Sequence, residues 1–252
     1  MMGNASIALE VRNLNKRFGS IIAAKNINLD FNEGEIVSII GTNGAGKTTF
    51  VNMVTGHLKP DSGSIRLFGT EITHWPSRKI VSAGLGRSFQ IPQLFDGMSV
   101  LDNLMTAAVI GGAQARFPWE NAVLLEHEIL CAHFIEKLNL QRYRNDFPDS
   151  LAGGTRKLLD IVMALVARPK LLLLDEPTSG VSEEEKMEVM EKALQAVEGE
   201  RMTTILIEHD MEIVRHFSDR VLAFVSGEVV ADGHPDVVFA NPVVIKSVTG
   251  QT

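Results

Sequence analysis

The sequence has 252 residues and a single cysteine, Cys131, so an internal disulfide is excluded. Because Cys131 lies within the helix-like stretch HEILCAHFIEKL, we interpret it as a small buried apolar residue and not as a reactive thiol. No apolar run approaches the roughly 18–20 residues of a membrane-spanning helix. The first residues, MMGNASIALEVRN, show no basic segment followed by an apolar one, so no secretory signal is predicted. Together these absences favour the cytosol.

The sequence also lacks an excess of basic residues, internal repeats and linker-like segments. Its 24 Lys and Arg against 31 Asp and Glu give a net charge of −7, which argues against general nucleic-acid binding and leaves open only a local basic patch. With 45% hydrophobic and 22% charged residues, the chain suits a single globular domain over residues 1–252, with room for a subdomain.

The hydrophobic pattern predicts an α/β fold. Apolar and polar residues alternate over the first thirty or so positions, which predicts short antiparallel strands, and DSGSIRLFGTEI predicts a further hairpin. EIVSII, LLLLD and TTILI instead predict buried strands, and a helical pattern follows each of them. Such alternation is typical of a parallel sheet that is covered by helices on both faces.

Between about residue 98 and residue 165 the pattern is mostly helical, which predicts an inserted helical subdomain. Seven apolar residues of this stretch fall near one face of the predicted helix: Val123, Leu124, Ile129, Leu130, Phe134, Ile135 and Leu138. Residues from about 231 to 252 are predicted to form a C-terminal extension of the domain.

The segment GTNGAGKTT, residues 41–49, fits the pattern G-x-x-x-x-G-K-[ST] between a predicted strand and a predicted helix. Its three glycines allow the backbone to curl so that N–H groups face a polyphosphate. Lys47 would reach the β- and γ-phosphate oxygens, and Thr48 would ligate Mg²⁺. The sequence therefore predicts a nucleoside triphosphate site formed by these residues: Gly41, Asn43, Gly44, Ala45, Gly46, Lys47, Thr48 and Thr49.

Two acids, Asp175 and Glu176, lie at the end of the predicted buried strand LLLLD. Asp175 suits a Mg²⁺ site that it reaches through a water molecule, because Mg²⁺ keeps most of its waters. Glu176 is expected to point elsewhere and to polarise an attacking water. The alternative interpretation of this acidic pair is an ordinary surface turn.

Two further polar residues, Gln90 and His209, each come just after a predicted strand. In open α/β sheets the ligand lies beyond the carboxyl ends of the strands, so these residues are expected to share one edge with Lys47, Asp175 and Glu176. Taken alone, His209 would be a surface or hydrogen-bonded histidine and Gln90 would be unremarkable. Their predicted common edge favours a functional role for both.

The stretch LAGGTRKLLDIVMALVARP predicts a helix that begins near Gly153 and Gly154 and stops at Pro169. Glycines at this position leave the first N–H groups of the helix bare, and such groups attract an anion. The residues themselves leave open whether that anion belongs to the same chain or to another molecule.

Five segments resemble, in this order, the motifs of the ATP-binding subunit of an ABC transporter: GTNGAGKTT, SFQ, LAGGT, LLLLDEPTSG and IEHD. The resemblance covers essentially the whole chain. It implies a P-loop NTPase (RecA-like) parallel-sheet core with an N-terminal antiparallel β subdomain and an inserted α-helical subdomain. It also implies that the protein binds ATP with Mg²⁺ and hydrolyses ATP.

The same resemblance implies a role for each predicted site residue. Two ATPase subunits would associate head to tail, so that the γ-phosphate held by Lys47 of one subunit meets Gly153 and Gly154 of the other. Glu176 would activate the attacking water and His209 would position it. The remaining two roles are carried over in the same way: Gln90 would bind Mg²⁺ and couple it to the permease, and Phe18, in KRFGS, would stack on adenine.

Two longer stretches, AGLGRSFQIPQLFDGMSVLDNL and GHPDVVFANPVVIKSVTG, are similar to ATPases of branched-chain amino-acid importers. This implies two transmembrane permease subunits, a second ATPase subunit that is identical or related, and, indirectly, an extracytoplasmic solute-binding protein. Residues around 91–105 would face the permease. The chain would then be cytoplasmic and peripheral on the inner face of the cell membrane, with no nucleic-acid partner.

Three alternatives remain open at this point. Relatives that import urea or other amides, or that export lipopolysaccharide, share part of the pattern. A soluble ABC ATPase acting on nucleic acid or ribosomes would usually carry tandem modules or long insertions, which this sequence lacks. A regulatory subunit that seldom hydrolyses ATP is favoured by the departures from the usual motifs.

These departures are Ala152 in place of serine, Thr155 in place of glutamine, and Ser182 in place of an acidic or amide residue. A hydrogen bond to a charged group is worth about 1.5–3 kcal/mol, so the missing hydroxyl at Ala152 predicts a weakened composite site. The two glycine amides remain, so the site is not expected to be lost. Ser182 is expected to act mainly as a helix cap, and its effect on the coupling of the two ATP sites stays open.

Overall fold

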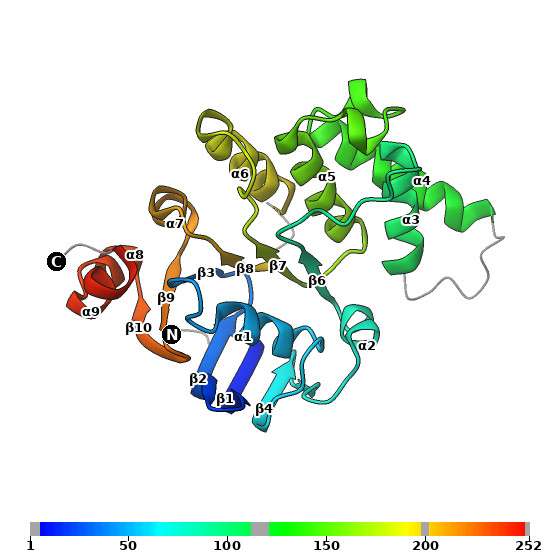
Figure 1. The fold of residues 1–252 in the computed structure, drawn as a ribbon. Helices are drawn as coiled ribbons and strands as arrows, with labels where there is room; N and C mark the ends of the chain where they lie inside the picture. Colours follow the sequence, from blue (N-terminus) through cyan, green and yellow to red (C-terminus); the bar gives the residue numbers. More distant parts are fainter. Residues whose placement is uncertain (1–5, 112–120, 198–201, 250–252) are drawn as a thin grey trace, which may run out of the picture. The chain divides into compact units, whose positions relative to one another are not determined.

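The computed structural model describes residues 6–111, 121–197 and 202–249. The chain divides into two compact units, of which the first holds Met1–Ala83 and Thr203–Thr252 and the second holds Gly84–Met202. Each unit is described by itself (Figure 1). In the described parts of the chain, no helix is both long and apolar enough to cross a membrane.

An antiparallel sheet opens the first unit, as the alternating pattern predicts. Its strands are in the order β2-β1-β4-β5 and have these bounds: β1 Ile7–Phe18, β2 Ile21–Asn32, β4 Ser62–Leu67 and β5 Thr70–Glu71. Asn13 and Asn26 each have a φ of 48°, where the β1–β2 register is irregular. Asn tolerates this left-handed conformation because its short side chain bonds nearby backbone. Here the neighbouring asparagines serve as acceptors, with Asn28 Oδ1 2.9 Å from the Asn13 amide.

A second sheet of the first unit runs in the order β10-β9-β3-β8. Its strands have these bounds: β3 Ile36–Ile40, β8 Thr203–Ile207, β9 Arg220–Val225 and β10 Glu228–Gly233. Strand β3 is parallel to both β8 and β9, and β9 forms an antiparallel hairpin with β10. Strand β8 is buried along its whole length, as expected for a parallel strand covered on both faces.

Helix α1, Lys47–Val54, contacts both sheets of the first unit. The ring of Phe50 is fully buried, and its centroid lies 6.4 Å from that of Phe31 on β2 and 5.5 Å from that of Phe224 on β9. The remaining helices of this unit are α2 Ser77–Ser82, α7 Met211–Phe217, α8 Pro235–Phe239 and α9 Pro242–Val244, followed by a π-helical turn Ile245–Thr249. The predicted C-terminal extension thus contains short helices, and Val238 and Val244 are buried in a cluster with Val221 of β9.

Among its described residues, the second unit contains a parallel strand pair and four longer helices. These elements are β6 Leu85–Ser88, β7 Leu171–Asp175, α3 Val100–Gly111, α4 Asn121–Lys137, α5 Gly153–Val166 and α6 Glu183–Val197, with 3₁₀ turns at Gln141–Tyr143 and Pro148–Ser150. Helix α5 contacts α3, α4 and α6, and Leu159 and Ile161 on it are fully buried. The limits of the helical subdomain stay a prediction, because this unit also includes β6, β7 and α6.

The expected apolar face of the helical stretch is correct only in part. Ile135 and Leu138 are buried, but Ile129 is exposed, so the seven residues do not form one buried face. The buried face of α4 instead runs through Cys131, which is fully buried as predicted. Burial raises the pKa of the Cys131 thiol to about 11. The side chains of Val123 and Leu124 lie outside the described residues.

Candidate functional site

The glycine-rich loop joins β3 to α1 in the first unit, and two of its glycines are required by close backbone contacts. A Cβ on Gly41 would lie 2.4 Å from the Phe224 carbonyl oxygen, and one on Gly46 would lie 2.3 Å from that of Ala23. Gly44 has a φ of 82° and open space around its Cα, so it is needed for conformation and not for packing. The Gly227 amide donates to the Ala45 carbonyl over 2.9 Å and fastens the loop to the β9–β10 turn.

The loop presents unused donors at the start of α1. Within the part of the chain that the structure describes, the N–H groups of Gly44, Gly46 and Thr48 donate to no acceptor. The side chain of Lys47 is buried and folds back over the loop, where Nζ donates to the Gly41 carbonyl at 2.6 Å and to the Thr42 carbonyl at 3.1 Å. Backbone amides and an ammonium group in this arrangement suit a polyphosphate.

His209 follows β8, the strand that pairs in parallel with β3, so within the first unit it lies at the same edge as the loop. The buried carboxylate of Glu208 shapes this turn, because Oε2 accepts the amide of His209 at 3.0 Å. Asp210 then caps α7 by accepting the Glu212 amide at 3.0 Å. The side chain of His209 is exposed at this turn.

Phe18, the predicted adenine contact, lies at the end of β1 and is half-exposed. The ammonium group of Lys16 lies 5.7 Å from the centroid of its ring. An exposed aromatic ring of this kind is free to stack on a planar ligand. The stacking role of Phe18 stays a prediction.

In the second unit, Asp175 is not isolated at the end of β7. Arg87 on the neighbouring strand β6 donates from Nη2 to Asp175 Oδ2 over 2.6 Å, and both side chains are largely buried. The guanidinium group also lies 4.9 Å from the centroid of the Phe89 ring, a cation–π distance. One carboxylate oxygen of Asp175 is therefore engaged by an ion pair that the sequence did not predict.

Gln90 and Glu176 are brought together in the same unit. Gln90 Nε2 donates to Glu176 Oε2 over 2.7 Å. Glu176 has a φ of 47°, a left-handed conformation that is unfavourable for a residue with a Cβ. Because β6 and β7 are parallel neighbours, both residues follow strands that end at the same edge, as predicted within this unit.

Helix α5 begins at Gly153 and Gly154, as the sequence predicts. Ala152 is its N-cap residue and makes no side-chain capping hydrogen bond, so the first amides of the helix are not used by a cap. A Cβ on Gly153 would lie 2.9 Å from the Gly180 carbonyl oxygen. Ser182 Oγ donates to Glu185 Oε2 over 2.9 Å just before α6, so this pair interacts as expected for residues at a helix start.

The oxygen atoms of the predicted Mg²⁺ ligands are of the chemical type that this ion binds. The hydrogen bonds described for Asp175 and Gln90 use Oδ2 and Nε2, so Asp175 Oδ1 and the Gln90 side-chain carbonyl oxygen are the atoms that would bind the ion, together with the Thr48 hydroxyl. Hard oxygen ligands of this type, with water completing the shell, are what Mg²⁺ prefers. Thr48 lies in the first unit and the other two in the second.

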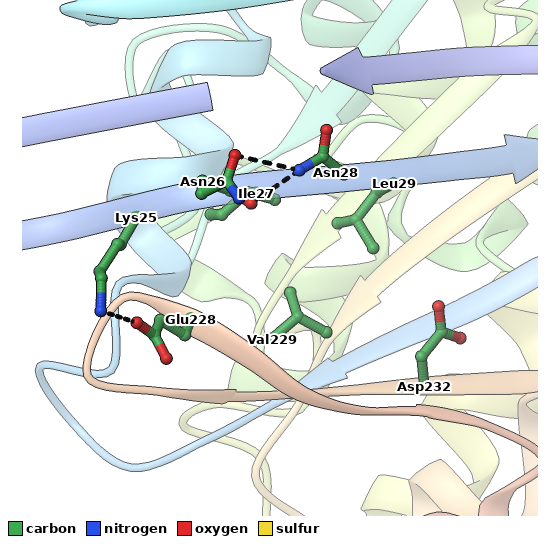
Figure 2. A pocket seen from close by; sticks show the side chains of 8 residues that line it. All are labelled: Lys25, Asn26, Ile27, Asn28, Leu29, Glu228, Val229 and Asp232. Atoms are coloured by element: carbon green, nitrogen blue, oxygen red, sulfur yellow. Dashed lines mark hydrogen bonds and ion pairs between the residues drawn. The ribbon is translucent and has the colours of Figure 1, made fainter. Parts of the chain in front are cut away.

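The structure also shows a pocket that the sequence did not indicate. It has a volume of about 400 Å³ and lies between β2 and β10, where Lys25 and Glu228 form an ion pair (Figure 2). Two asparagines of β2, Asn26 and Asn28, and Asp232 of β10 complete its polar lining. None of the predicted site residues lines this pocket.

Comparison with known proteins places these motifs in a family. The family described as ABC transporter matches residues 24–179. The high-affinity branched-chain amino acid transport ATP-binding protein BraF of Pseudomonas aeruginosa is 36% identical over 252 residues, covering 96% of this chain and 98% of that protein. The protein LivG of Escherichia coli, which carries the same description, is 34% identical over 249 residues, with 96% and 98% covered.

Solved structures agree with this relationship. The ATP-binding cassette MJ1267 of an ABC transporter superposes with a TM-score of 0.84 at 28% identity, covering 95% of this chain and 98% of that one. A dimer of the cassette MJ0796 bound to ADP and Pi gives a TM-score of 0.77 at 25% identity, with 90% and 98% covered. The parallel-sheet P-loop NTPase fold is therefore confirmed. By sequence and by fold, this chain belongs to the ABC transporter family, as an ATP-binding and ATP-hydrolysing subunit.

Proposed function

We propose that this chain is the motor subunit of an importer for branched-chain or related amino acids, driving transport through two associated permease subunits. The observation that carries the proposal is its similarity to BraF and LivG over nearly the full length of each protein. Both relatives are described as branched-chain amino acid transport ATP-binding proteins. A second ATPase subunit, identical or related, and an extracytoplasmic solute-binding protein complete the proposed complex.

In the proposed reaction the first unit binds the triphosphate of ATP. The amides of Gly44, Gly46 and Thr48 surround the phosphates, and Lys47 exchanges its contacts with the Gly41 and Thr42 carbonyls for contacts with phosphate oxygens. Mg²⁺, held by Thr48, Asp175 and Gln90, would supply charge neutralisation at the same oxygens. Asn43, Ala45 and Thr49 line the site, and Phe18 stacks on adenine.

The second unit provides the groups that act on the attacking water. Glu176 accepts the proton of that water, and the hydrogen bond from Gln90 Nε2 holds its carboxylate in one orientation. His209, from the first unit, positions the water and the terminal phosphate. The amides of Gly153 and Gly154 stabilise developing charge on the γ-phosphate of ATP held by a partner ATPase subunit.

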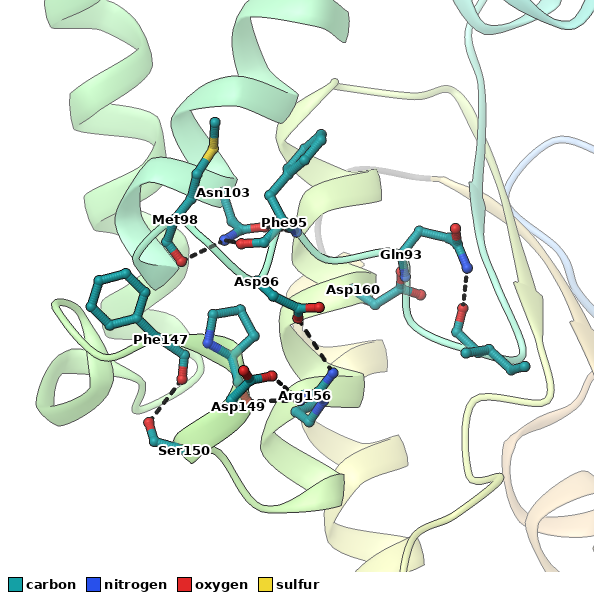
Figure 3. Close-up of polar contacts among 12 residues, drawn as sticks. Gln93, Phe95, Asp96, Met98, Asn103, Phe147, Asp149, Ser150, Arg156 and Asp160 are labelled. Atoms are coloured by element: carbon teal, nitrogen blue, oxygen red, sulfur yellow. Dashed lines mark hydrogen bonds and ion pairs between the residues drawn. The ribbon is translucent and has the colours of Figure 1, made fainter.

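Exposed apolar residues of the second unit support a permease contact. Ile91, Phe95 and Met98 lie in the segment predicted to face the permease, and Phe147 is a further exposed apolar residue of this unit. Asn103 braces this segment, because its side chain accepts the Phe95 amide at 2.8 Å and donates to the Phe95 and Met98 carbonyls, both at 3.1 Å (Figure 3). Exposed apolar groups on a braced segment are typical of an interaction surface. Docking there would hold the chain at the inner face of the membrane.

The test is transport by the reconstituted complex. The chain, its two permeases and a solute-binding protein are placed in proteoliposomes, and uptake of leucine, urea and a basic amino acid is measured with ATP inside or outside. ATP-dependent leucine uptake with stimulated hydrolysis is expected. Uptake of urea without leucine would overturn the substrate class, and transport without hydrolysis by this chain would assign it the regulatory role.

A further inference from the structure

We propose that Lys157 and Asp160 on α5 are positioning residues, which hold Gln90 and through it Glu176 in the geometry needed for hydrolysis. This inference rests on the proposed function, because it concerns the residues assigned there to the attacking water. It connects the N-terminus of α5 with the side chain proposed as the base. The motif residues by themselves do not show this connection.

Lys157 lies in the first turn and a half of α5 and is only 1% exposed. Its ammonium group donates to the Phe89 carbonyl at 2.7 Å and to the Gln90 carbonyl at 2.9 Å. An ammonium group buried this deeply must have its donors satisfied, since leaving a charge unpaired in the interior costs several kcal/mol. Two of its acceptors, the Phe89 and Gln90 carbonyls, belong to the loop directly after β6.

Asp160 is 5% exposed, and its carboxylate accepts hydrogen bonds from backbone amides of the same loop. Oδ2 accepts the Phe89 amide and Oδ1 accepts the Gln93 amide, each at 3.0 Å, and Figure 3 shows the carboxylate beside Gln93. Burial raises the pKa of Asp160, while the two amides and nearby Lys157 act in the opposite direction. Both carboxylate oxygens of Asp160 therefore accept hydrogen bonds from backbone amides.

The two residues are three positions apart on α5, so they lie on one face of the helix. Between them they bind two carbonyls and two amides of residues 89–93, which form an otherwise irregular segment. The four bonds hold the loop near both of its ends, at Phe89 and at Gln93. We call this set of four hydrogen bonds the loop clamp.

The loop clamp joins α5 to the proposed base. Lys157 bonds the backbone of Gln90, and the side chain of Gln90 bonds Glu176 at 2.7 Å. Gly153, whose amide we propose to meet the partner's phosphate, is the first residue of the same helix as Lys157. One continuous set of bonds within the second unit therefore links the helix end that faces a partner's ATP to the base that acts on the chain's own ATP.

This arrangement predicts a specific kinetic signature. Lys47 and the amides of the phosphate loop lie in the first unit, so loss of the loop clamp leaves these phosphate contacts unchanged. Gln90 and Glu176 would lose their fixed orientation, and small misplacement of reacting groups lowers the chemical rate by roughly 100-fold in other enzymes. The expected effect is therefore on kcat and not on KM.

The experiment compares Lys157→Met, Lys157→Arg and Asp160→Asn with the control Lys137→Met. Lys137 is also a lysine of the second unit whose ammonium group donates to a backbone carbonyl, that of Ala196 at 3.3 Å. This bond does not involve the loop of residues 89–93. Three quantities are measured: amide hydrogen exchange at residues 89–93, affinity for a fluorescent ATP analogue, and the kcat and KM of hydrolysis. Thermal melts verify that each variant is folded.

For Lys157→Met and Asp160→Asn we expect faster exchange at Phe89 and Gln93, ATP affinity within about twofold of wild type, and a kcat lower by roughly 10- to 100-fold. Lys157→Arg should restore part of the rate, and Lys137→Met should change none of these values. Unchanged exchange, or an unchanged kcat with faster exchange, would overturn the inference. Wild-type hydrolysis by Glu176→Gln would instead overturn the proposed assignment of the base, while the exchange result would still report on the loop clamp.

Discussion

Arg87 and Asp175 form a buried ion pair between two neighbouring parallel strands, with Nη2 2.6 Å from Oδ2. The carboxylate at the end of β7, predicted to reach Mg²⁺, is thus held by a cation from its own unit. The pair engages Asp175 Oδ2, so Oδ1 is the oxygen that we propose for a ligand.

We expect Arg87→Gln to destabilise the second unit. Breaking a buried pair from one side costs about 3–5 kcal/mol, because the other charge stays buried without its partner. Urea denaturation, followed by fluorescence, measures the change. The control is Arg66→Gln, which removes an exposed pair with Glu71 at 3.3 Å and should cost no more than about 1 kcal/mol. Equal costs for the two variants would contradict a structural role for the Arg87 pair.

Glu176→Gln should abolish most hydrolysis and leave an ATP-bound pair of subunits. The amide keeps the shape and a hydrogen-bonding group for Gln90, but it cannot accept the proton of the attacking water. Phosphate release is the assay, and light scattering with and without ATP measures association. Glu191→Gln, the same change at an exposed position of α6, is the matched control. Wild-type turnover in Glu176→Gln would show that another group is the base.

Ala152→Ser should strengthen ATP-dependent association. A hydroxyl at this position can bond a partner's phosphate, which is worth roughly 10- to 150-fold in affinity. Because Ala152 is an N-cap without a capping bond, serine would also stabilise α5 by about 0.5–2 kcal/mol. Light scattering across concentration in the Glu176→Gln background measures the first effect, and urea denaturation without nucleotide measures the second. A gain in stability without a gain in association would mean that no phosphate reaches α5.

Two glycines of the phosphate loop should respond differently to alanine. Gly46→Ala would place a Cβ 2.3 Å from the Ala23 carbonyl oxygen, so the loop must shift and nucleotide binding should be lost. Gly44→Ala meets open space and carries only the left-handed conformational cost of about 1–2 kcal/mol. Equilibrium binding of a fluorescent ATP analogue separates them. Equal loss of binding would show that conformation, and not packing at Ala23, limits this loop.

The Cys131 thiol should react slowly in the folded protein. Its pKa is raised to about 11 by burial, and a shift of about two units lowers the thiolate fraction near pH 8 by roughly 100-fold. The folded state favours the neutral thiol, so this contribution to stability is present below the ordinary thiol pKa and is lost as pH rises toward 11. Reaction with an aromatic disulfide in native and denaturing buffer measures the ratio. Similar rates in both buffers would contradict burial of the thiol.

The sequence predicted the residues whose roles depend on local spacing. The loop around Lys47, the glycines at the start of α5 and the acids at the end of β7 are all recognisable because a strand, a turn and a helix follow one another within a few residues. The antiparallel start of the chain was predictable for the same reason, since alternation is a local signal.

The residues that hold the site together were not predictable in this way. Lys157 and Asp160 look like the solvated charges of an amphipathic helix, and only the fold brings them to a loop about seventy positions earlier. Arg87 is separated from Asp175 by 88 positions. Ile129 shows the limit of periodicity from the other side, because it was placed on the apolar face of its helix by spacing and is exposed. Contacts between distant segments leave no periodic trace in a single sequence.

The aromatic contacts of Phe50 have a consequence for ligand affinity. Its ring lies between Phe31 and Phe224, so the helix that carries Lys47 is packed against both sheets of the first unit. The amides of the phosphate loop are therefore aligned when the chain folds, and a nucleotide meets a receptor that is already ordered. Little conformational entropy is left to lose on binding, so the affinity for ATP should follow the polar contacts of its phosphates.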